Sequence, residues 1–234
     1  MSKIFSPTDR ADAITTARRW MTDNPLFLDT ETTGLSFHDR IVEIAVVNAA
    51  GAPVYRHLVN PIISIPAEAT AIHGITNEMV SGCPTFDMIL QELYNGLCGS
   101  TVVIYNAAYD YRMIQQSIEL TGVLRAIAAI SDIIHPVCAM KLFAQFQGEW
   151  DNRHGQYKWH TLDKAMYLTH QPWPINEMPH RATADAKACR LIVMAMAMAV
   201  TSDAIDDNNG ITWPPLMSDE EEDDLRRSEQ EAKP

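Results

Sequence analysis

Several features are scarce in this chain of 234 residues. It has four cysteines, with neither the CxxC spacing of metal sites nor the density of a disulfide scaffold: Cys83, Cys98, Cys138 and Cys189. The longest apolar stretch, Leu191 to Val200, is about half the ~20 residues that a transmembrane helix needs. The first residues, MSKIFSPTDR, lack the apolar segment and the cleavage site of a secretory signal. We therefore expect a soluble protein with reduced thiols and a cytoplasmic location.

Positive charge is also scarce, since 18 Lys and Arg face 30 Asp and Glu, for a formal net charge of −12. This balance argues against a nucleic-acid partner. However, residues 203–234 carry 11 acidic and 3 basic side chains, which leaves the preceding residues at only −4. Their run SDEEEDDLRRSEQEAKP cannot bury enough apolar surface to become ordered. We therefore predict one domain over residues 1–202, followed by an acidic, disordered C-terminal tail over residues 203–234.

The hydrophobic patterning predicts an α/β protein. Strands are expected over residues 25–30, 41–48, 53–59, 101–105 and 129–134. Helices are expected over residues 7–21, 67–73, 76–80, 84–95, 108–120, 136–147, 161–168 and 180–200. Short connections between the first three strands favour an antiparallel meander, and later strands alternate with helices. The expected architecture is a mixed sheet, with a meander and parallel strands, flanked by helices.

Two acidic side chains end the first expected strand, in the stretch FLDTETTGL. Asp29 and Glu31 are separated by one residue, so in a strand both side chains project from the same face. Two neighbouring carboxylates repel each other and are costly to desolvate, and this stretch contains no Lys or Arg. The pair indicates either a bound cation or a solvated strand end.

Two later stretches add further acidic groups. VVIYNAAYD places Asp110 one turn into a helix that follows a strand, and HRATADA places His180 and Asp185 five residues apart near the start of the last helix. Each group alone is typical of a helix cap or a surface residue. Only the whole set indicates a common site.

Together these stretches resemble the motifs of the DnaQ-like family of 3′-to-5′ exonucleases, in its DEDDh branch. The first family motif, DxETTGL, is similar to Asp29 to Leu35. The second, NAxFD, is similar to Asn106 to Asp110, with Tyr109 where Phe is common, and the third, HRAxxDA, is similar to His180 to Ala186. AIHGIT, Ala71 to Thr76, resembles the family's segment beside the substrate end. The acidic tail and residues 148–159 lie outside the match.

The resemblance implies a ribonuclease H-like fold and a two-metal site. Asp29, Glu31, Asp110 and Asp185 are expected to converge and to hold two divalent ions, Mg²⁺ or Mn²⁺. Oxygen ligands suit such hard cations, and a pair of ions assists hydrolysis of an anionic phosphodiester. His180 is the expected general base, because an unperturbed imidazole with a pKa near 6.5 accepts a proton at neutral pH.

The resemblance also implies contacts to the terminal nucleotide. The residues expected to bind the substrate lie in the first motif, the AIHGIT segment and the second motif: Thr32, Thr33, Gly34, Leu35, His73, Asn106 and Tyr109. An apolar group such as Leu35 offers a surface to a base without reading its sequence. Leu35 as a core residue and His73 as a structural turn residue remain alternatives, and Asn106 and Tyr109 are equally suited to bracing the second motif.

Residues 148–159 combine aromatic and basic side chains. The aromatic residues Trp150, Tyr157 and Trp159 alternate with Arg153, His154 and Lys158. Such a composition suits the binding of phosphates and stacked bases, but it equally suits a surface insertion whose aromatic rings pack against neighbouring helices.

The expected activity is metal-dependent 3′-to-5′ hydrolysis of single-stranded or frayed nucleic-acid ends, with release of 5′-mononucleotides. CAMKLF, Cys138 to Phe143, resembles the exodeoxyribonuclease X type of member and favours DNA, as in repair or proofreading. The alternatives are an exoribonuclease that trims RNA 3′ ends and a catalytically silent nucleic-acid-binding or polymerase-binding module. A polymerase or another protein is a possible partner, and the oligomeric state stays open.

Overall fold

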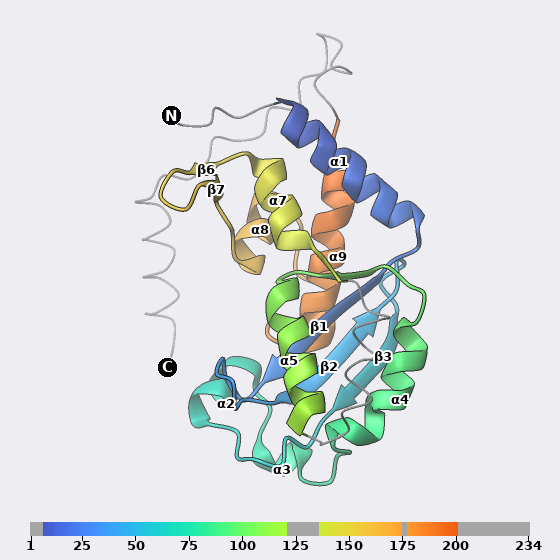
Figure 1. Cartoon of the computed structure of the whole chain (residues 1–234), viewed down its shortest axis with the longest axis vertical. Helices are drawn as coiled ribbons and strands as arrows, with labels where there is room; N and C mark the ends of the chain where they lie inside the picture. Colours follow the sequence, from blue (N-terminus) through green and yellow to red (C-terminus); the bar gives the residue numbers. More distant parts are fainter. Residues whose placement is uncertain (1–6, 121–135, 175–176, 201–234) are drawn as a thin grey trace. The chain divides into compact units, whose positions relative to one another are not determined.

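The computed structural model describes residues 7–120, 136–174 and 177–200 (Figure 1). The chain divides into two units, Met1–Thr201 and Ser202–Pro234, and every described residue lies in the first unit. The strand predicted over residues 129–134 and the tail predicted over residues 203–234 lie outside the described residues.

A five-stranded sheet forms the centre of the first unit. Its strands are β1 (Leu26–Thr32), β2 (Ile41–Val47), β3 (Pro53–Leu58), β4 (Val102–Ile104) and β5 (Val137–Cys138). Their order is β3-β2-β1-β4-β5, with antiparallel pairing from β1 to β3 and parallel pairing of β1 with β4 and of β4 with β5. The predicted meander and the predicted parallel strands are therefore confirmed, and β1 lies in the middle of the sheet.

Helices cover both faces of this sheet (Figure 1). The helices of the described residues are α1 (Pro7–Thr22), α2 (Ala67–His73), α3 (Asn77–Val80), α4 (Phe86–Leu97), α5 (Ala107–Leu120), α7 (Ala139–Gln147), α8 (Leu162–Leu168) and α9 (Ala182–Met198). No helix within these described segments is both long enough and apolar enough to cross a membrane.

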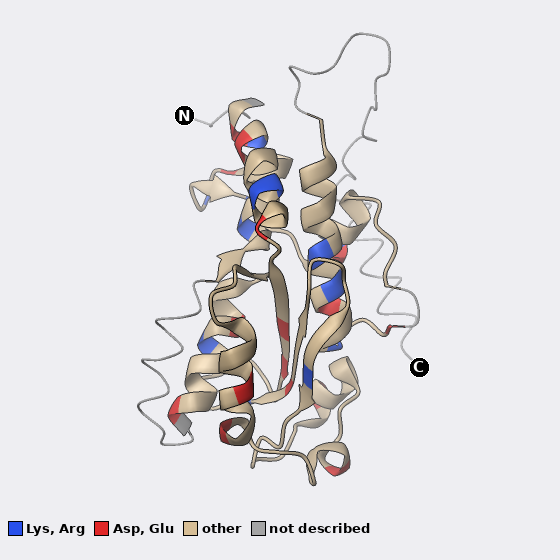
Figure 2. Ribbon diagram, turned by 90° about the vertical axis from the view of Figure 1, so that its right-hand side faces the viewer, with Lys and Arg blue, Asp and Glu red and all other residues tan. Residues whose placement is uncertain are grey.

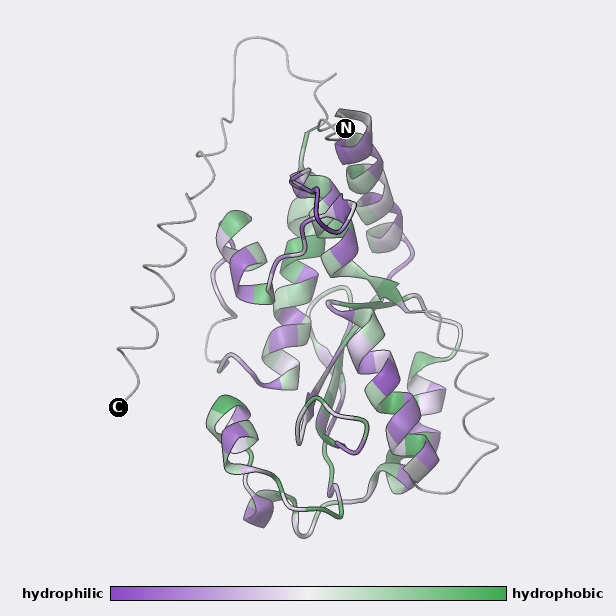
Figure 3. Ribbon diagram, turned by 60° about the vertical axis from the view of Figure 1, so that its left-hand side comes forward, coloured by the Kyte–Doolittle hydropathy of each residue, from purple (hydrophilic) through white to green (hydrophobic). Residues whose placement is uncertain are grey.

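The alternation of side chains along β1 assigns its two faces. Phe27 belongs to a buried core with residues of α1, α7 and α9, whereas Leu28 belongs to a second core with residues of α4 and α5. Because successive side chains of a strand point to opposite faces, Asp29 and Glu31 point to the same side as Phe27, toward α9. Figure 3 shows hydrophobic colour on the later turns of α9 and more hydrophilic colour near its start, which is the end that meets these carboxylates.

The clearest differences from the predicted elements lie in the second half of the chain. The last helix begins at Ala182 and not at His180, because His180 has the left-handed φ of 58° and Arg181 is extended. The helix predicted from residue 136 begins at Ala139, because the two preceding residues form the edge strand β5. The predicted loop over residues 148–159 contains a short hairpin, β6 (Trp150–Asp151) and β7 (Gln156–Tyr157).

Candidate active site

Three of the predicted metal ligands meet where β1 faces the start of α9. Asp29, Glu31 and Asp185 each offer a carboxylate oxygen, and these atoms lie within 4.8 Å of one another. Strand alternation places the first two on one face, and Asp185 lies in the first turn of α9. A set of three converging carboxylate oxygens is the donor type that Mg²⁺ and Mn²⁺ prefer.

Asp110 approaches β1 from the α5 side. Its side chain is only 4% exposed, and its Oδ1 accepts hydrogen bonds from the Thr30 backbone N–H (3.1 Å) and from the Thr30 hydroxyl (2.8 Å). Thr30 lies between the two acidic residues of β1, so these bonds hold Asp110 directly beside them. Asp110 is not within the 4.8 Å group, but its charge raises the pKa values of both Asp29 and Glu31.

The carboxylates have raised pKa values, and burial is the largest cause in every case. Burial and then the charges of neighbouring carboxylates raise the pKa of Glu31 to about 8 and that of Asp29 well above its usual range. For Asp110 and Asp185, burial raises the pKa more than their hydrogen bonds lower it, and the result is a pKa of about 7. Figure 2 shows acidic residues on the central strands and both signs of charge on the adjoining helix. Concentrated negative charge of this kind is what a divalent cation would stabilise.

His180 lies at the rim of this cluster. Its backbone N–H donates a hydrogen bond to Oδ1 of Asp185 (3.2 Å), and its residue is exposed to solvent. The left-handed backbone at this position turns the chain immediately before α9. The structure therefore ties the backbone of His180 to a carboxylate of the cluster and leaves the imidazole accessible to solvent.

The segment after β1 is braced from α5. The hydroxyl oxygens of Thr32 and Tyr109 lie 2.6 Å apart, and the Tyr109 hydroxyl also donates to the carbonyl of Gly34 (3.1 Å). A Cβ atom at Gly34 would lie 2.8 Å from the Asp39 carboxylate, so the close approach of this loop requires glycine. Leu35 is 77% exposed, which contradicts its alternative role as a core residue. Tyr109 thus braces the first motif.

Thr33 closes the same loop. Its side chain donates to Oδ1 of Asp39 (2.7 Å), and its backbone N–H donates to the carbonyl of Arg40 (2.9 Å). Asn106 has an exposed side chain, while its carbonyl accepts the Tyr109 N–H (2.9 Å) at the start of α5. The backbone of Asn106 therefore helps to begin the helix, and its amide group is open to a ligand.

His73 is buried beside the first motif. It is 4% exposed, and its Nδ1 accepts the Ile75 N–H (3.0 Å). Burial lowers its pKa, while the nearby Thr32 carbonyl opposes this shift. No hydrogen bond of normal geometry reaches its Nε2 from the described residues. His73 therefore has a turn-forming role through Nδ1, while its Nε2 is buried.

Two residues of the site region were missed from the sequence. Glu43 is 0% exposed on β2, directly opposite Glu31, and the signal was an acidic residue inside the apolar run IVEIAVV. Phe37 is 77% exposed in the loop after β1, with the guanidinium of Arg112 5.2 Å from its ring centre. Its signal was a large apolar side chain in the polar stretch SFHDR.

Some side chains of residues 148–159 pack within the protein, as expected for a surface insertion. The rings of Trp150 and Tyr157 meet edge to face, with their centres 5.3 Å apart, and the Tyr157 hydroxyl donates to the Asp9 carboxylate of α1. Lys158 forms an ion pair with Glu149 (2.9 Å). Arg153, His154 and Trp159 are exposed.

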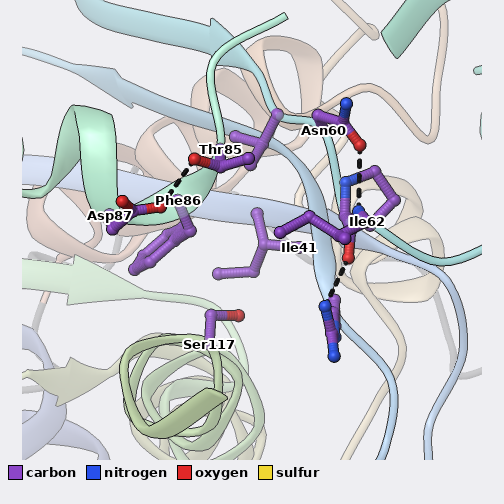
Figure 4. Close-up of a pocket in the computed structure, with 10 residues that line it drawn as sticks. Ile41, Asn60, Ile62, Thr85, Phe86, Asp87 and Ser117 are labelled. Carbon is purple, nitrogen blue, oxygen red and sulfur yellow. Dashed lines mark hydrogen bonds between the residues drawn. The ribbon is translucent and has the colours of Figure 1, made fainter. Parts of the chain in front are cut away.

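A separate pocket of about 340 Å³ lies beside the start of β2 (Figure 4). Residues from the starts of β2 and α4, the loop after β3 and α5 line it, including Ile41, Ile62, Phe86 and Ser117. The lining residues include none of the four carboxylates described above. This pocket is therefore distinct from the carboxylate cluster.

Comparisons with known proteins agree with this geometry. Residues 26–193 match the RNase_T family model, described as exonuclease. The uncharacterized exonuclease CP81 of Escherichia phage 186 is 40% identical over 181 residues, which cover 77% of this chain and 92% of that protein. The DNA polymerase III subunit epsilon of Buchnera aphidicola subsp. Schizaphis graminum is 31% identical over 134 residues, 52% of this chain and 58% of the relative. A solved 3′-exonuclease that recognises the 3′ end of a histone mRNA stem-loop has a TM-score of 0.57 at 16% identity, covering 75% of this chain and 64% of that chain.

Proposed function

Because this chain belongs to the DnaQ-like family of 3′-to-5′ exonucleases, in its DEDDh branch, we propose that it removes 5′-mononucleotides from DNA 3′ ends. Its five-stranded mixed sheet, flanked by helices, is the ribonuclease H-like fold of that family. The observation that carries the proposal is the convergence of three carboxylate oxygens within 4.8 Å. Members of this branch use divalent metal ions, and the cluster supplies a suitable donor set.

Asp29, Glu31 and Asp185 would hold the ions, with Asp110 beside them. Two divalent ions, Mg²⁺ or Mn²⁺, would neutralise the carboxylates and stabilise the negative charge that develops on the phosphate. His180 accepts the proton of the attacking water, because its backbone N–H is bonded to Asp185 of the cluster and its imidazole is exposed to solvent.

The terminal nucleotide would bind along the loop after β1. Leu35 and Phe37 present exposed apolar side chains to a base, whereas His73 is buried and would support this region from within the protein. Apolar and aromatic contacts tolerate every base, so sequence specificity is not expected. Thr32, Thr33 and Gly34 shape the backbone that approaches the nucleotide, and Asn106 offers its exposed amide.

DNA is the favoured substrate because the relatives include a subunit of DNA polymerase III. That relation also supports a polymerase or another protein as a partner, and a role in DNA repair or proofreading. A cytoplasmic location stays a prediction. Trimming of RNA 3′ ends is the second candidate, since no residue has been identified that reads a 2′-hydroxyl. A catalytically silent binding module is disfavoured, because all five predicted catalytic residues are present: Asp29, Glu31, Asp110, His180 and Asp185.

Digestion of 5′-labelled substrates tests the proposal. Single-stranded DNA, blunt duplex, mismatched duplex and RNA of one sequence are incubated with Mg²⁺, Mn²⁺ or EDTA. We expect a ladder that shortens from the unlabelled 3′ end, with DNA cut faster than RNA and no products in EDTA. Asp185→Asn is the matched inactive control. Metal-independent products, or no products from the wild type on any substrate, would contradict the proposed activity.

A further inference from the structure

Glu43 is a further carboxylate on the face of the sheet that carries Asp29 and Glu31. Its position on β2 is paired with Glu31 on β1, and side chains directly opposite each other in an antiparallel pair point to the same face. It is completely buried, so its charge requires strong partners within the protein. Both of its carboxylate oxygens accept hydrogen bonds from the start of α9, which indicates a role other than that of a metal ligand.

The partners of Glu43 come from the start of α9. Arg181 donates two hydrogen bonds to it, from Nε to Oε2 (2.8 Å) and from its terminal nitrogen to Oε1 (2.7 Å). The backbone N–H of Ala182 donates a third, to Oε2 (3.1 Å). Arg56 contributes a longer contact of 3.5 Å from a half-exposed side chain. A two-pronged arginine bond fixes direction as well as distance, which a single-point contact does not.

Arg181 stands between two groups of the proposed mechanism. His180 precedes it directly, and the N–H of Asp185 donates to the carbonyl of Arg181 (3.0 Å) in the first turn of α9. Arg181 is also the extended N-cap residue of this helix, and it makes no side-chain cap of its own. Its side chain is therefore committed to β2, and the helix start is tied to the strand that neighbours β1.

We infer that Glu43 and Arg181 form a buried clamp that positions the start of α9 against the carboxylates of β1. The inference rests on the proposed function, since it assigns to this pair the placement of His180 and Asp185. The clamp opposes the mutual repulsion of the carboxylates that β1 and α9 bring together. Glu43 and Arg181 are positioning residues, and neither is expected to contact the substrate.

Arg181→Lys is the discriminating variant, because lysine keeps the positive charge but cannot form the two-pronged bond. If the clamp positions the start of α9, its loss should lower kcat on single-stranded DNA by about 10- to 100-fold with a nearly unchanged KM. This is the effect expected when a catalytic group is displaced by about 1 Å. Hydrogen exchange of the amides over residues 182–188 should become faster. Glu43→Gln removes the clamp from its other partner and should produce both effects.

Arg190→Gln is the matched control. Arg190 anchors the same helix through a hydrogen bond from Nε to the Ala49 carbonyl (2.6 Å), about 13 Å along the helix axis from Arg181. Its loss should leave kcat near the wild-type value and accelerate exchange only in the later turns of α9. The inference is overturned if Arg181→Lys retains wild-type kcat and exchange, or if Arg190→Gln lowers kcat equally.

The two proposals fail in different ways. A wild-type protein that degrades no nucleic acid contradicts the proposed function, whereas the exchange measurement still decides whether the pair holds the start of α9. Unchanged exchange in both Arg181→Lys and Glu43→Gln overturns the clamp whatever the activity. Should Arg181→Lys not fold, Glu43→Gln supplies the same comparison, with calorimetric Mn²⁺ binding as a further readout that needs no turnover.

Discussion

His180 holds a backbone conformation that few side chains tolerate. Its φ of 58° lies in the left-handed region, which glycine and asparagine occupy most readily. An alanine variant at this position would therefore combine two changes, the loss of the imidazole and added backbone strain. Replacements that tolerate a left-handed backbone separate the two effects.

We predict that His180→Asn and His180→Gly both lower kcat by about 10²- to 10⁴-fold, the usual contribution of general acid–base catalysis. Both replacements accept the left-handed backbone, so the thermal midpoint and the affinity for Mn²⁺ should stay close to wild type. Steady-state kinetics together with calorimetry checks this. Near-normal turnover in either variant would remove His180 from the mechanism.

Phe37 offers a second test at the residue scale. Its ring is largely exposed and is supported by the guanidinium of Arg112, which also donates to the Leu35 carbonyl (3.2 Å). We predict that Phe37→Ala raises KM for single-stranded DNA by about 5- to 100-fold, equivalent to ~1–3 kcal/mol for one base stacked on an aromatic ring. The melting temperature should not change, since the ring buries little area.

Phe37→Tyr serves as the control that keeps an aromatic ring, and its KM should be near wild type. If Phe37→Ala binds DNA as tightly as the wild type, this side chain lies away from the path of the substrate.

Among the elements, the β6–β7 hairpin most clearly divides structural from binding side chains. Because Lys158 is paired with Glu149 and Tyr157 bonds to α1, the hairpin has a packing role. We predict that Arg153→Ala combined with Lys158→Ala leaves the salt dependence of single-strand binding unchanged. Fluorescence anisotropy over a range of salt concentrations measures the slope.

Two lost phosphate contacts would instead reduce the slope by about 1.4, at ~0.7 for each charge on a single strand. Such a decrease would show that the exposed side of the hairpin binds the nucleic acid. Tyr157→Phe provides the opposite control, since it should lower stability by about 1 kcal/mol without changing the slope.

At the scale of the whole molecule, the acidic cluster couples stability to pH and to metal. In the unfolded chain the carboxyl groups have ordinary pKa values of 3.8 for Asp and 4.5 for Glu. In the folded protein the pKa is about 7 for Asp110 and Asp185 and about 8 for Glu31. Between these values the folded state binds more protons than the unfolded state, so stability falls as pH rises.

We therefore predict that in EDTA the free energy of unfolding falls as the pH rises from about 4 to about 8. Mn²⁺ should restore much of this loss at pH 8, because bound ions compensate the ionised carboxylates. Denaturant unfolding of the wild type and of Asp29→Asn/Asp185→Asn checks both effects. The double variant should show a shallower decline and little response to metal, and equal profiles for the two proteins would contradict the prediction.

The acidic segment over residues 203–234 belongs to the same scale. With 11 acidic and 3 basic side chains, it should repel nucleic acid at low ionic strength. We predict that its removal tightens single-strand binding at low salt and has little effect at high salt, where charges are screened. As the control, residues 203–234 are replaced by a neutral Gly/Ser segment of equal length. Unchanged binding at low salt would contradict the prediction and would favour a role of the tail in solubility or in binding a basic partner.

Local sequence was sufficient for most of the elements and for the carboxylates that converge in the structure. Alternation along FLDTETTGL assigned Asp29 and Glu31 to one face because the period of a strand depends only on the backbone. The meander followed from short connections, and the spacing of the three motifs indicated the carboxylate set. These properties depend on residues that are near one another in the chain.

Tertiary structure alone decided how these pieces meet. A buried Glu43 is unfavourable unless a cation pairs with it, and that cation belongs to Arg181, 138 residues away in the chain. The start of α9 could not be located from helical pattern, because that clamp and the turn at His180 set it. Contacts between distant segments depend on the packing of the whole sheet, which no local pattern encodes.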